Sequence, residues 1–161
     1  MSLSRPSPVR VLTTALVVLV LAFSMLAGYT LGPGTPKASA ALISATKADA
    51  AVEWARSRKG SPYGYGADGP NRFDCSGLTR WVYSRVGRSL PHSSSAQVSR
   101  TERIRKENRR RGDLVFFYSH GGIYHVAIYA GRGYIWHASR PGTPVQRVKP
   151  WTSSLFYGRV K

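Results

Sequence analysis

Cys75 is the only cysteine in this chain of 161 residues, and it opens a predicted helix. The polar turn Phe73-Asp74 precedes it, and the amphipathic stretch Leu78–Val86 follows. The partial positive charge at a helix N-terminus favours a thiolate, which can attack an acyl carbon near neutral pH. Cys75 is therefore a candidate nucleophile, the alternative being a small buried hydrophobic residue.

Two histidines are candidates for the base that such a nucleophile needs. His125 lies in the alternating strand pattern of residues 123–129, and His137 lies in the next one, residues 134–139. A hairpin centred on Gly131 would pair the two positions directly and set their imidazoles side by side. With Cys75 they would form a nucleophile, a base and a group that orients the base, starting from a thiolate–imidazolium pair.

The other two histidines, His92 and His120, fall in predicted loops. We expect both to be solvated, with His120 able to border a substrate cleft. No carboxylate or third histidine stands at ligand spacing beside His125 and His137, so the sequence predicts no metal site.

The N-terminal segment has the pattern of a secretory signal. Arg5 and Arg10 precede an uncharged apolar run, residues 11–31, and Ala38-Ser39-Ala40 offers a cleavage site after Ala40. The run is also long enough to span a bilayer, so an uncleaved anchor is the alternative. In either case residues from 41 onward face the oxidising exterior. A lone cysteine has no intramolecular disulfide partner there, which suggests that its thiol has a function.

The predicted mature part, residues 41–161, is one strongly basic domain of 121 residues. It keeps a net charge of +14, because residues 1–40 hold three of the 24 basic residues and none of the seven acidic ones. This charge favours contact with polyanions such as teichoic acids or anionic lipids. The basic run 103–111 is the candidate patch, the alternative being a solvated loop.

The pattern of apolar residues predicts an α+β fold, with helices first and strands later. Glycine-bearing turns separate the strands, so the sheet should be antiparallel, and the charged stretch 100–111 should be a loop or a helix edge. The helices are expected at residues 45–58, 75–87 and 92–98, and the strands at 114–118, 123–129, 134–139, 145–148 and 156–160.

Taken together, several motifs resemble those of the NlpC family of papain-like cell-wall peptidases, from about Ala48 to Val160. The motifs are Tyr63-Gly64-Tyr65-Gly66, Phe73-Asp74-Cys75-Ser76-Gly77-Leu78, Leu90-Pro91, Arg111-Gly112-Asp113-Leu114-Val115-Phe116-Phe117, His125-Val126-Ala127-Ile128-Tyr129 and Ile135-Trp136-His137-Ala138. The chain departs from the family pattern at His92, where relatives often have arginine, and at Arg111, where they usually have proline. The tripeptide Arg111-Gly112-Asp113 is then a turn into a strand.

The resemblance implies a papain-like α+β fold with a nucleophile helix packed on an antiparallel sheet of about five strands. It implies that Cys75 attacks an amide of the peptidoglycan stem peptide, commonly the bond between γ-D-glutamate and the diamino acid. His125 would be the base and His137 the polar third member. No cofactor is implied.

Three further positions take roles from the same resemblance. The hydroxyl of Tyr63, with the backbone N–H of Cys75, would stabilise the oxyanion. Asp74 and Ser76 match positions that in some relatives bind the free amino end of a trimmed stem peptide, while helix capping is the alternative for Asp74.

Two other functions stay open at this point. One is a cationic wall-binding module with a vestigial cysteine, and the other is a papain-like amidase or acyltransferase acting on another amide. Aromatic residues are not interleaved with the basic run, so no specific nucleic acid is expected. We expect a monomer that is secreted to the cell wall, with a membrane contact only if residues 1–40 are retained.

Overall fold

The computed structural model describes residues 41–161. The predicted signal segment and its cleavage site, residues 1–40, lie outside the described residues. Over residues 41–161, no helix combines the length and apolar character needed to cross a membrane.

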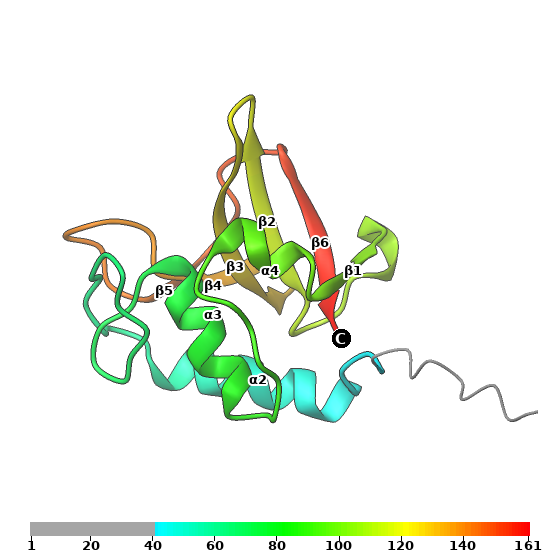
Figure 1. Ribbon diagram of the computed structural model, residues 1–161, viewed down its shortest axis with the longest axis horizontal. Coiled ribbons are helices and arrows are strands. Elements are labelled where there is room, and N and C mark those ends of the chain that lie inside the picture. The colour runs from blue at the N-terminus through cyan, green and yellow to red at the C-terminus, as the bar shows by residue number, and fades with distance from the viewer. Residues whose placement is uncertain (1–40) are drawn as a thin grey trace, which may run out of the picture. The chain divides into compact units, whose positions relative to one another are not determined.

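The described part is an α+β fold in which helices precede an antiparallel sheet of six strands (Figure 1). The spatial order of the strands is β1-β6-β2-β3-β4-β5. The helical elements are α2 (Ala45–Ser57), α3 (Cys75–Ser84), α4 (Ser94–Val98) and the short 3-10 helix η2 (Lys106–Asn108). The strands are β1 (Thr101–Ile104), β2 (Leu114–Ser119), β3 (Gly122–Gly131), β4 (Tyr134–His137), β5 (Gln146–Val148) and β6 (Leu155–Val160).

Alternation along β3 divides the core into two parts. Val126 and Ile128 are fully buried on the face against which α2 and α3 pack. Ala127 and Tyr129 belong to a second cluster on the opposite face. Because side chains alternate along a strand, His125 shares the second face, as the sequence predicts.

Side-chain caps define where the two longer helices begin. Ser44 accepts a hydrogen bond from the backbone N–H of Lys47 at 3.3 Å, which confirms the predicted start of α2. Asp74 accepts one from the N–H of Gly77 at 2.6 Å, so α3 begins at Cys75. Each cap satisfies a backbone donor that has no partner within the helix.

The prediction for residues 100–111 as a loop or helix edge is wrong at β1, which pairs antiparallel with β6. Thr101 is buried opposite Val160, whereas Glu102 and Arg103 are exposed. A charged strand is tolerated here because β1 forms the edge of the sheet, where one side of the strand faces solvent.

The β3–β4 hairpin also differs from the direct pairing that we expected. Arg132 and Gly133 form a two-residue turn, both with positive φ (53° and 78°), the geometry that matches the twist of a hairpin. A register shift between Tyr129 and Gly131 follows, and Ile128 then pairs with Trp136. Continued along the strands, this register makes His125 a diagonal neighbour of His137.

A buried ion pair joins the start of β2 to β6. Asp113 is fully buried and accepts from Nε of Arg159 at 2.9 Å, from its Nη2 at 3.0 Å, and from the N–H of Arg110 at 2.8 Å. These contacts place the tripeptide 111–113 in a turn that leads into β2, as predicted. Because Asp113 is fully buried and engaged by three donors, it serves to hold this turn in place.

Substituting Gly77 by alanine should destabilise the fold, because the first turn of α3 touches the loop before it. A Cβ at Gly77 would lie 2.1 Å from the carbonyl oxygen of Ala67 and 2.8 Å from the Cα of Asp68. We expect Gly77→Ala to lower the free energy of unfolding by about 3 kcal/mol or more, measured by urea denaturation.

Gly121→Ala is the matched control. The nearest atom to a Cβ there is the Ser119 hydroxyl at 3.9 Å, so we expect a change within about 0.5 kcal/mol. Equal stability of the two variants would contradict the role given to Gly77.

Candidate active site

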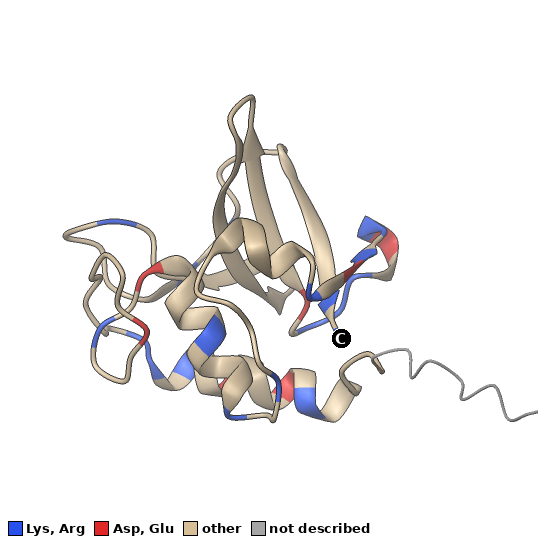
Figure 2. Ribbon diagram, in the orientation of Figure 1, with Lys and Arg blue, Asp and Glu red and all other residues tan. Residues whose placement is uncertain are grey.

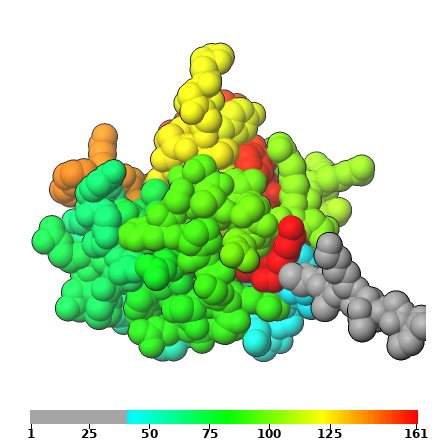
Figure 3. Space-filling model, in the orientation of Figure 1, coloured from blue at the N-terminus to red at the C-terminus, as the bar shows by residue number. Residues whose placement is uncertain are grey.

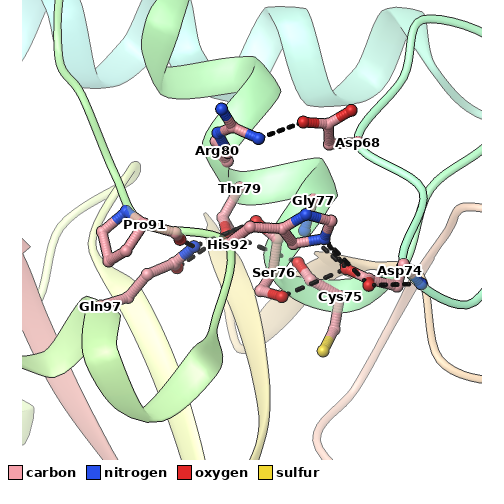
Figure 4. Close-up of polar contacts among 11 residues, drawn as sticks. Asp68, Asp74, Cys75, Ser76, Gly77, Thr79, Arg80, Pro91, His92 and Gln97 are labelled. Carbon is pink, nitrogen blue, oxygen red and sulfur yellow. Dashed lines mark hydrogen bonds and ion pairs between the residues drawn. The ribbon is translucent and has the colours of Figure 1, made fainter.

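The first turn of α3 presents the Cys75 thiol beside strand β3 (Figure 4). Burial raises the pKa of Cys75, the backbone N–H of Val126 lowers it, and the charge of Asp74 raises it. Burial is the largest effect and leaves the pKa above its usual value. The contact with Val126 places the sulfur next to the residue that follows His125.

The two histidines form one linked pair, as predicted, although their strands pair in a different register. Nδ1 of His137 lies 3.2 Å from Nε2 of His125, and the rings are nearly perpendicular at 88°. Both side chains are buried, with 4% and 5% exposure respectively. Within residues 41–161, no group of three or more His, Cys, Asp or Glu side chains is arranged to hold a metal ion.

Burial keeps both imidazoles neutral at pH 7. Burial, and then the charge of His137, lowers the pKa of His125 to about 3, and burial lowers that of His137 to about 4. These directions favour a thiol and a neutral imidazole over the expected thiolate–imidazolium pair, because desolvation disfavours both charged forms.

The hydrogen bond within the pair decides which ring nitrogen is available. Nε2 of His125 is engaged with His137, which leaves Nδ1 as the ring nitrogen outside this bond. Nδ1 can accept a proton in the tautomer in which His125 carries its proton on Nε2 and donates it to Nδ1 of His137. The two imidazoles are thus arranged so that one can orient the other.

Trp151 belongs to this site, although the sequence did not point to it. In the loop between β5 and β6, its ring stacks on Phe117 at 4.3 Å and 4°. The same indole lies 5.3 Å from the ring of His125 and 5.4 Å from that of His137, while half of its surface stays exposed. It therefore screens the imidazoles from water. A large aromatic residue in a polar loop was the only signal.

Tyr63 lies in the loop before α3, and its backbone forms an isolated bridge with that of Phe73. Burial raises the pKa of its phenol, and the charges of Cys75 and Asp74 raise it further. Those interactions place the hydroxyl near the thiol. Tyr63 therefore keeps its proton and can donate a hydrogen bond to a nearby oxyanion.

Asp74 is occupied by donors of its own chain (Figure 4). Its carboxylate accepts from the N–H groups of Gly66 at 2.9 Å and Gly77 at 2.6 Å, and from the Ser76 hydroxyl at 3.2 Å. Nε2 of His92 lies 3.0 Å from both carboxylate oxygens. The expectation that Asp74 caps the helix is confirmed.

The prediction that His92 is solvated is wrong, because its side chain is only 25% exposed and bonds to Asp74. Buried Gln97 donates to the carbonyls of Pro91 at 2.8 Å and Ser76 at 3.0 Å, and so holds this loop against α3. His120 is exposed in the β2–β3 turn, as predicted.

The basic run 103–111 is only partly free. Arg110 bonds to the carbonyl of Ile43, and Arg111 pairs with Glu53 and Asp49 on α2. The guanidinium of Arg109 lies over the ring of Tyr129. The exposed members that form no ion pair within the described residues are Arg103 on β1, Arg105 between β1 and η2, and Lys106 on η2 (Figure 2).

Comparison with known proteins finds related sequences and folds. The model of the NlpC/P60 family matches residues 60–159. A probable endopeptidase of Corynebacterium glutamicum is 47% identical over 119 residues, covering 68% of this chain and 56% of that protein. The probable endopeptidase p60 of Listeria monocytogenes is 40% identical over 109 residues, covering 66% of this chain and 22% of that protein. This chain therefore spans about half or less of the length of these relatives.

Solved structures show the same fold. The NlpC/p60 domain of the peptidoglycan hydrolase SagA superposes with a TM-score of 0.64 at 36% identity, covering 71% of this chain and 98% of that one. RipD from Mycobacterium tuberculosis, described as a non-catalytic NlpC/p60 domain protein adapted to peptidoglycan binding, gives 0.61 at 26% identity, covering 71% and 96%.

The pKa of Cys75 predicts how the thiol reacts with a small alkylating agent. Because burial raises this pKa, we expect the rate of alkylation by iodoacetamide to be low at pH 6 and to rise with a midpoint above the usual range of cysteine. Mass spectrometry of the modified protein across pH gives the profile. A rate that stays high down to pH 5 would instead indicate a preformed ion pair.

Removing the indole of Trp151 should raise the pKa of both imidazoles toward their usual value, because water then reaches the rings. We expect Trp151→Ala to move both titrations upward, as measured by NMR of the histidine side chains. Trp54→Ala, a similarly exposed tryptophan on α2 that contacts Trp81, is the control and should leave them unchanged. Unmoved titrations in Trp151→Ala would refute the screening role.

Proposed function

The chain belongs to the NlpC/P60 family, and we propose on that premise that it is a cysteine endopeptidase that hydrolyses peptidoglycan. The observation that carries the proposal is a linked pair of histidines, one of which neighbours the strand residue that the Cys75 thiol contacts. Cys75 begins α3, and its thiol contacts Val126 of β3. The residue before Val126 is His125, which is linked to His137. Relatives named as endopeptidases, and a domain from a peptidoglycan hydrolase, support the reaction class.

The reaction starts from neutral partners. Nδ1 of His125 takes the thiol proton as Sγ of Cys75 attacks the scissile carbonyl carbon. The backbone N–H of Cys75 and the hydroxyl of Tyr63 stabilise the oxyanion of the tetrahedral intermediate. His125 then returns the proton to the departing amine, leaving a thioester on Cys75. Water activated by His125 hydrolyses this acyl-enzyme and restores the thiol.

His137 acts as an orienting group in this scheme. By accepting the Nε2–H of His125, it holds the reactive tautomer and stabilises the imidazolium as it forms. Structures of the resuscitation promoting factor interacting protein RipA exist with changes at a cysteine, a histidine and a glutamate. The last two positions are twelve residues apart, as His125 and His137 are, which supports a polar orienting role at this position.

The substrate we propose is the bond between γ-D-glutamate and the diamino acid of the stem peptide. Asp74 and Ser76 are the candidates for holding a free amino end of that peptide. The carboxylate of Asp74 already accepts bonds from four residues, so a substrate ammonium would have to replace one of them, and His92 is a more exposed side-chain donor than buried Ser76. Capping of α3 is then the first role of Asp74, and substrate binding the second.

The protein would work outside the membrane, delivered by the predicted signal segment. Three exposed basic residues in the segment from β1 to η2 would attract it to anionic wall polymers: Arg103, Arg105 and Lys106. The alternative is a binding module without activity, the description given to RipD. The chain has Cys75 together with the linked pair His125 and His137, which favours the enzyme.

The test compares residues 41–161 with the Cys75→Ala variant on purified peptidoglycan, with soluble fragments identified by mass spectrometry. We expect fragments that end in γ-glutamate, absent with the variant. A folded, reduced and wall-bound protein that releases no fragments from several wall chemistries would favour the binding module. Fragments of another kind would change the substrate but keep the nucleophile.

Substitutions at the histidines should separate the base from the orienting group. We expect His125→Ala to lower kcat/KM on a soluble stem peptide by about 10³-fold or more, because it removes the general base. His137→Ala should cost less, about 100-fold at most, since geometry partly keeps His125 in place. Circular dichroism checks folding. A larger loss at His137 than at His125 would reverse the assignment.

A further inference from the structure

A pocket of about 330 Å³ lies beside the two histidines, and the proposed mechanism does not use it. The loop between β4 and β5 forms most of it, and Trp151 closes it. We call it the Arg140 pocket. Its lining residues are Ser139, Arg140, Thr143, Gln146 and Trp151.

The Arg140 pocket adjoins the catalytic pair through two of its walls. Trp151 contacts the rings of both His125 and His137. Gln146 is the register partner of His137 in the pairing of β4 with β5. One tryptophan therefore borders both the imidazoles and the pocket.

The β4–β5 loop is also tied to the segment that carries Tyr63. The N–H of Gly60 bonds to the carbonyl of Val145 at 2.9 Å, and the N–H of Val145 to the carbonyl of Ser61 at 2.8 Å. The two segments lie side by side on the surface, orange and teal in Figure 3. The pocket is thus held at a fixed place beside the site.

The position of His125 as the base indicates which part of the substrate would contact the Arg140 pocket. His125 must return its proton to the nitrogen of the departing amine, so that amine lies on the imidazole side of the thiol. Asp74 raises the pKa of the thiol, and the charge of Cys75 raises the pKa of Tyr63, so both residues lie near the thiol in the segment before α3. The Arg140 pocket adjoins the imidazoles and so lies where the leaving part of a stem peptide would extend.

The lining of the pocket suits an anion. It offers a guanidinium, two hydroxyls, a side-chain amide and an indole N–H, and it contains no carboxylate. Within residues 41–161, Arg140 makes no ion pair, whereas Arg111 pairs with two carboxylates and Arg159 with one. A guanidinium binds a carboxylate through two parallel hydrogen bonds, a contact that an amide cannot replace.

We propose that the Arg140 pocket binds a carboxylate on the part of the stem peptide that leaves as the amine. Arg140 is thereby a specificity-determining residue that favours substrates with an unamidated acid on that side. The inference rests on the proposed endopeptidase function. The carboxylate has two sources, the α-carboxyl of the diamino acid or a second carboxyl at the far end of its side chain, as in diaminopimelate.

The test measures kcat/KM on four synthetic peptides of the form L-Ala-γ-D-Glu-X. X is diaminopimelate, diaminopimelate amidated at the far carboxyl, diaminopimelate amidated at the α-carboxyl, or lysine. We expect amidation of the bound carboxyl to lower kcat/KM roughly tenfold or more. The lysine peptide, which lacks the far carboxyl, distinguishes the two sources.

Variants then assign the effect to Arg140. Arg140→Gln should remove the preference for the free acid, and Arg140→Lys should keep part of it. Arg100→Gln, an exposed arginine in the turn before β1, is the control for loss of one positive charge and should keep the full preference. A wild type that does not discriminate, or an Arg140→Gln variant that still does, would overturn the proposal.

The proposal stays testable if no peptide is cleaved. Diaminopimelate is then titrated into the wild type and into Arg140→Gln, with binding followed by NMR of the Trp151 indole N–H. Saturable shifts in the wild type, weakened at least tenfold in the variant, support the pocket even if the endopeptidase function fails. Identical titrations, or no shift in either protein, reject it.

Discussion

The contacts that fix the first turn of α3 are the constraint on which the site depends. Asp74 gathers donors from the preceding loop, from the helix itself and from the loop that carries His92. Gly77 lets the backbone of Ala67 and Asp68 approach the helix closely. Buried Gln97 ties the next loop to the same turn. Because three segments meet here, the position of the Cys75 thiol is determined by buried polar contacts rather than by the helix alone.

Desolvation is the second organising effect. Burial raises the pKa of Cys75 and lowers those of His125 and His137, so each group rests in its uncharged form. A protonated thiol is less open to oxidation than a thiolate, which protects a lone cysteine. The ion pair would form only as the substrate excludes water and the oxyanion appears.

The same burial has a consequence for stability. Both histidines have a lower pKa in the folded state than in the unfolded state, where it is about 6.5. Below about pH 6.5 the unfolded state therefore binds more protons than the folded state. Stability that depends on His125 and His137 is therefore present above that pH. It is lost as the pH falls toward their folded pKa values of about 3 and 4.

Charge acts at two ranges in this protein. The net charge of +17 in the whole chain acts over long distances and favours contact with anionic polymers. Individual arginines act locally and differ in their partners. Arg159 neutralises buried Asp113, Arg111 ties its loop to α2, and Arg140 faces a pocket without an acid. The count of basic residues alone does not distinguish these roles.

Local signals in the sequence determined the helix starts, the strands of the main sheet and the three site residues Cys75, His125 and His137. Caps and alternation depend on residues a few positions apart, so they can be read from the chain. The edge strand β1, the diagonal placement of His125 and His137, and the contacts of His92 and Trp151 arise from segments distant in sequence. Only the tertiary structure decided them, because burial, register and desolvation depend on which segments meet.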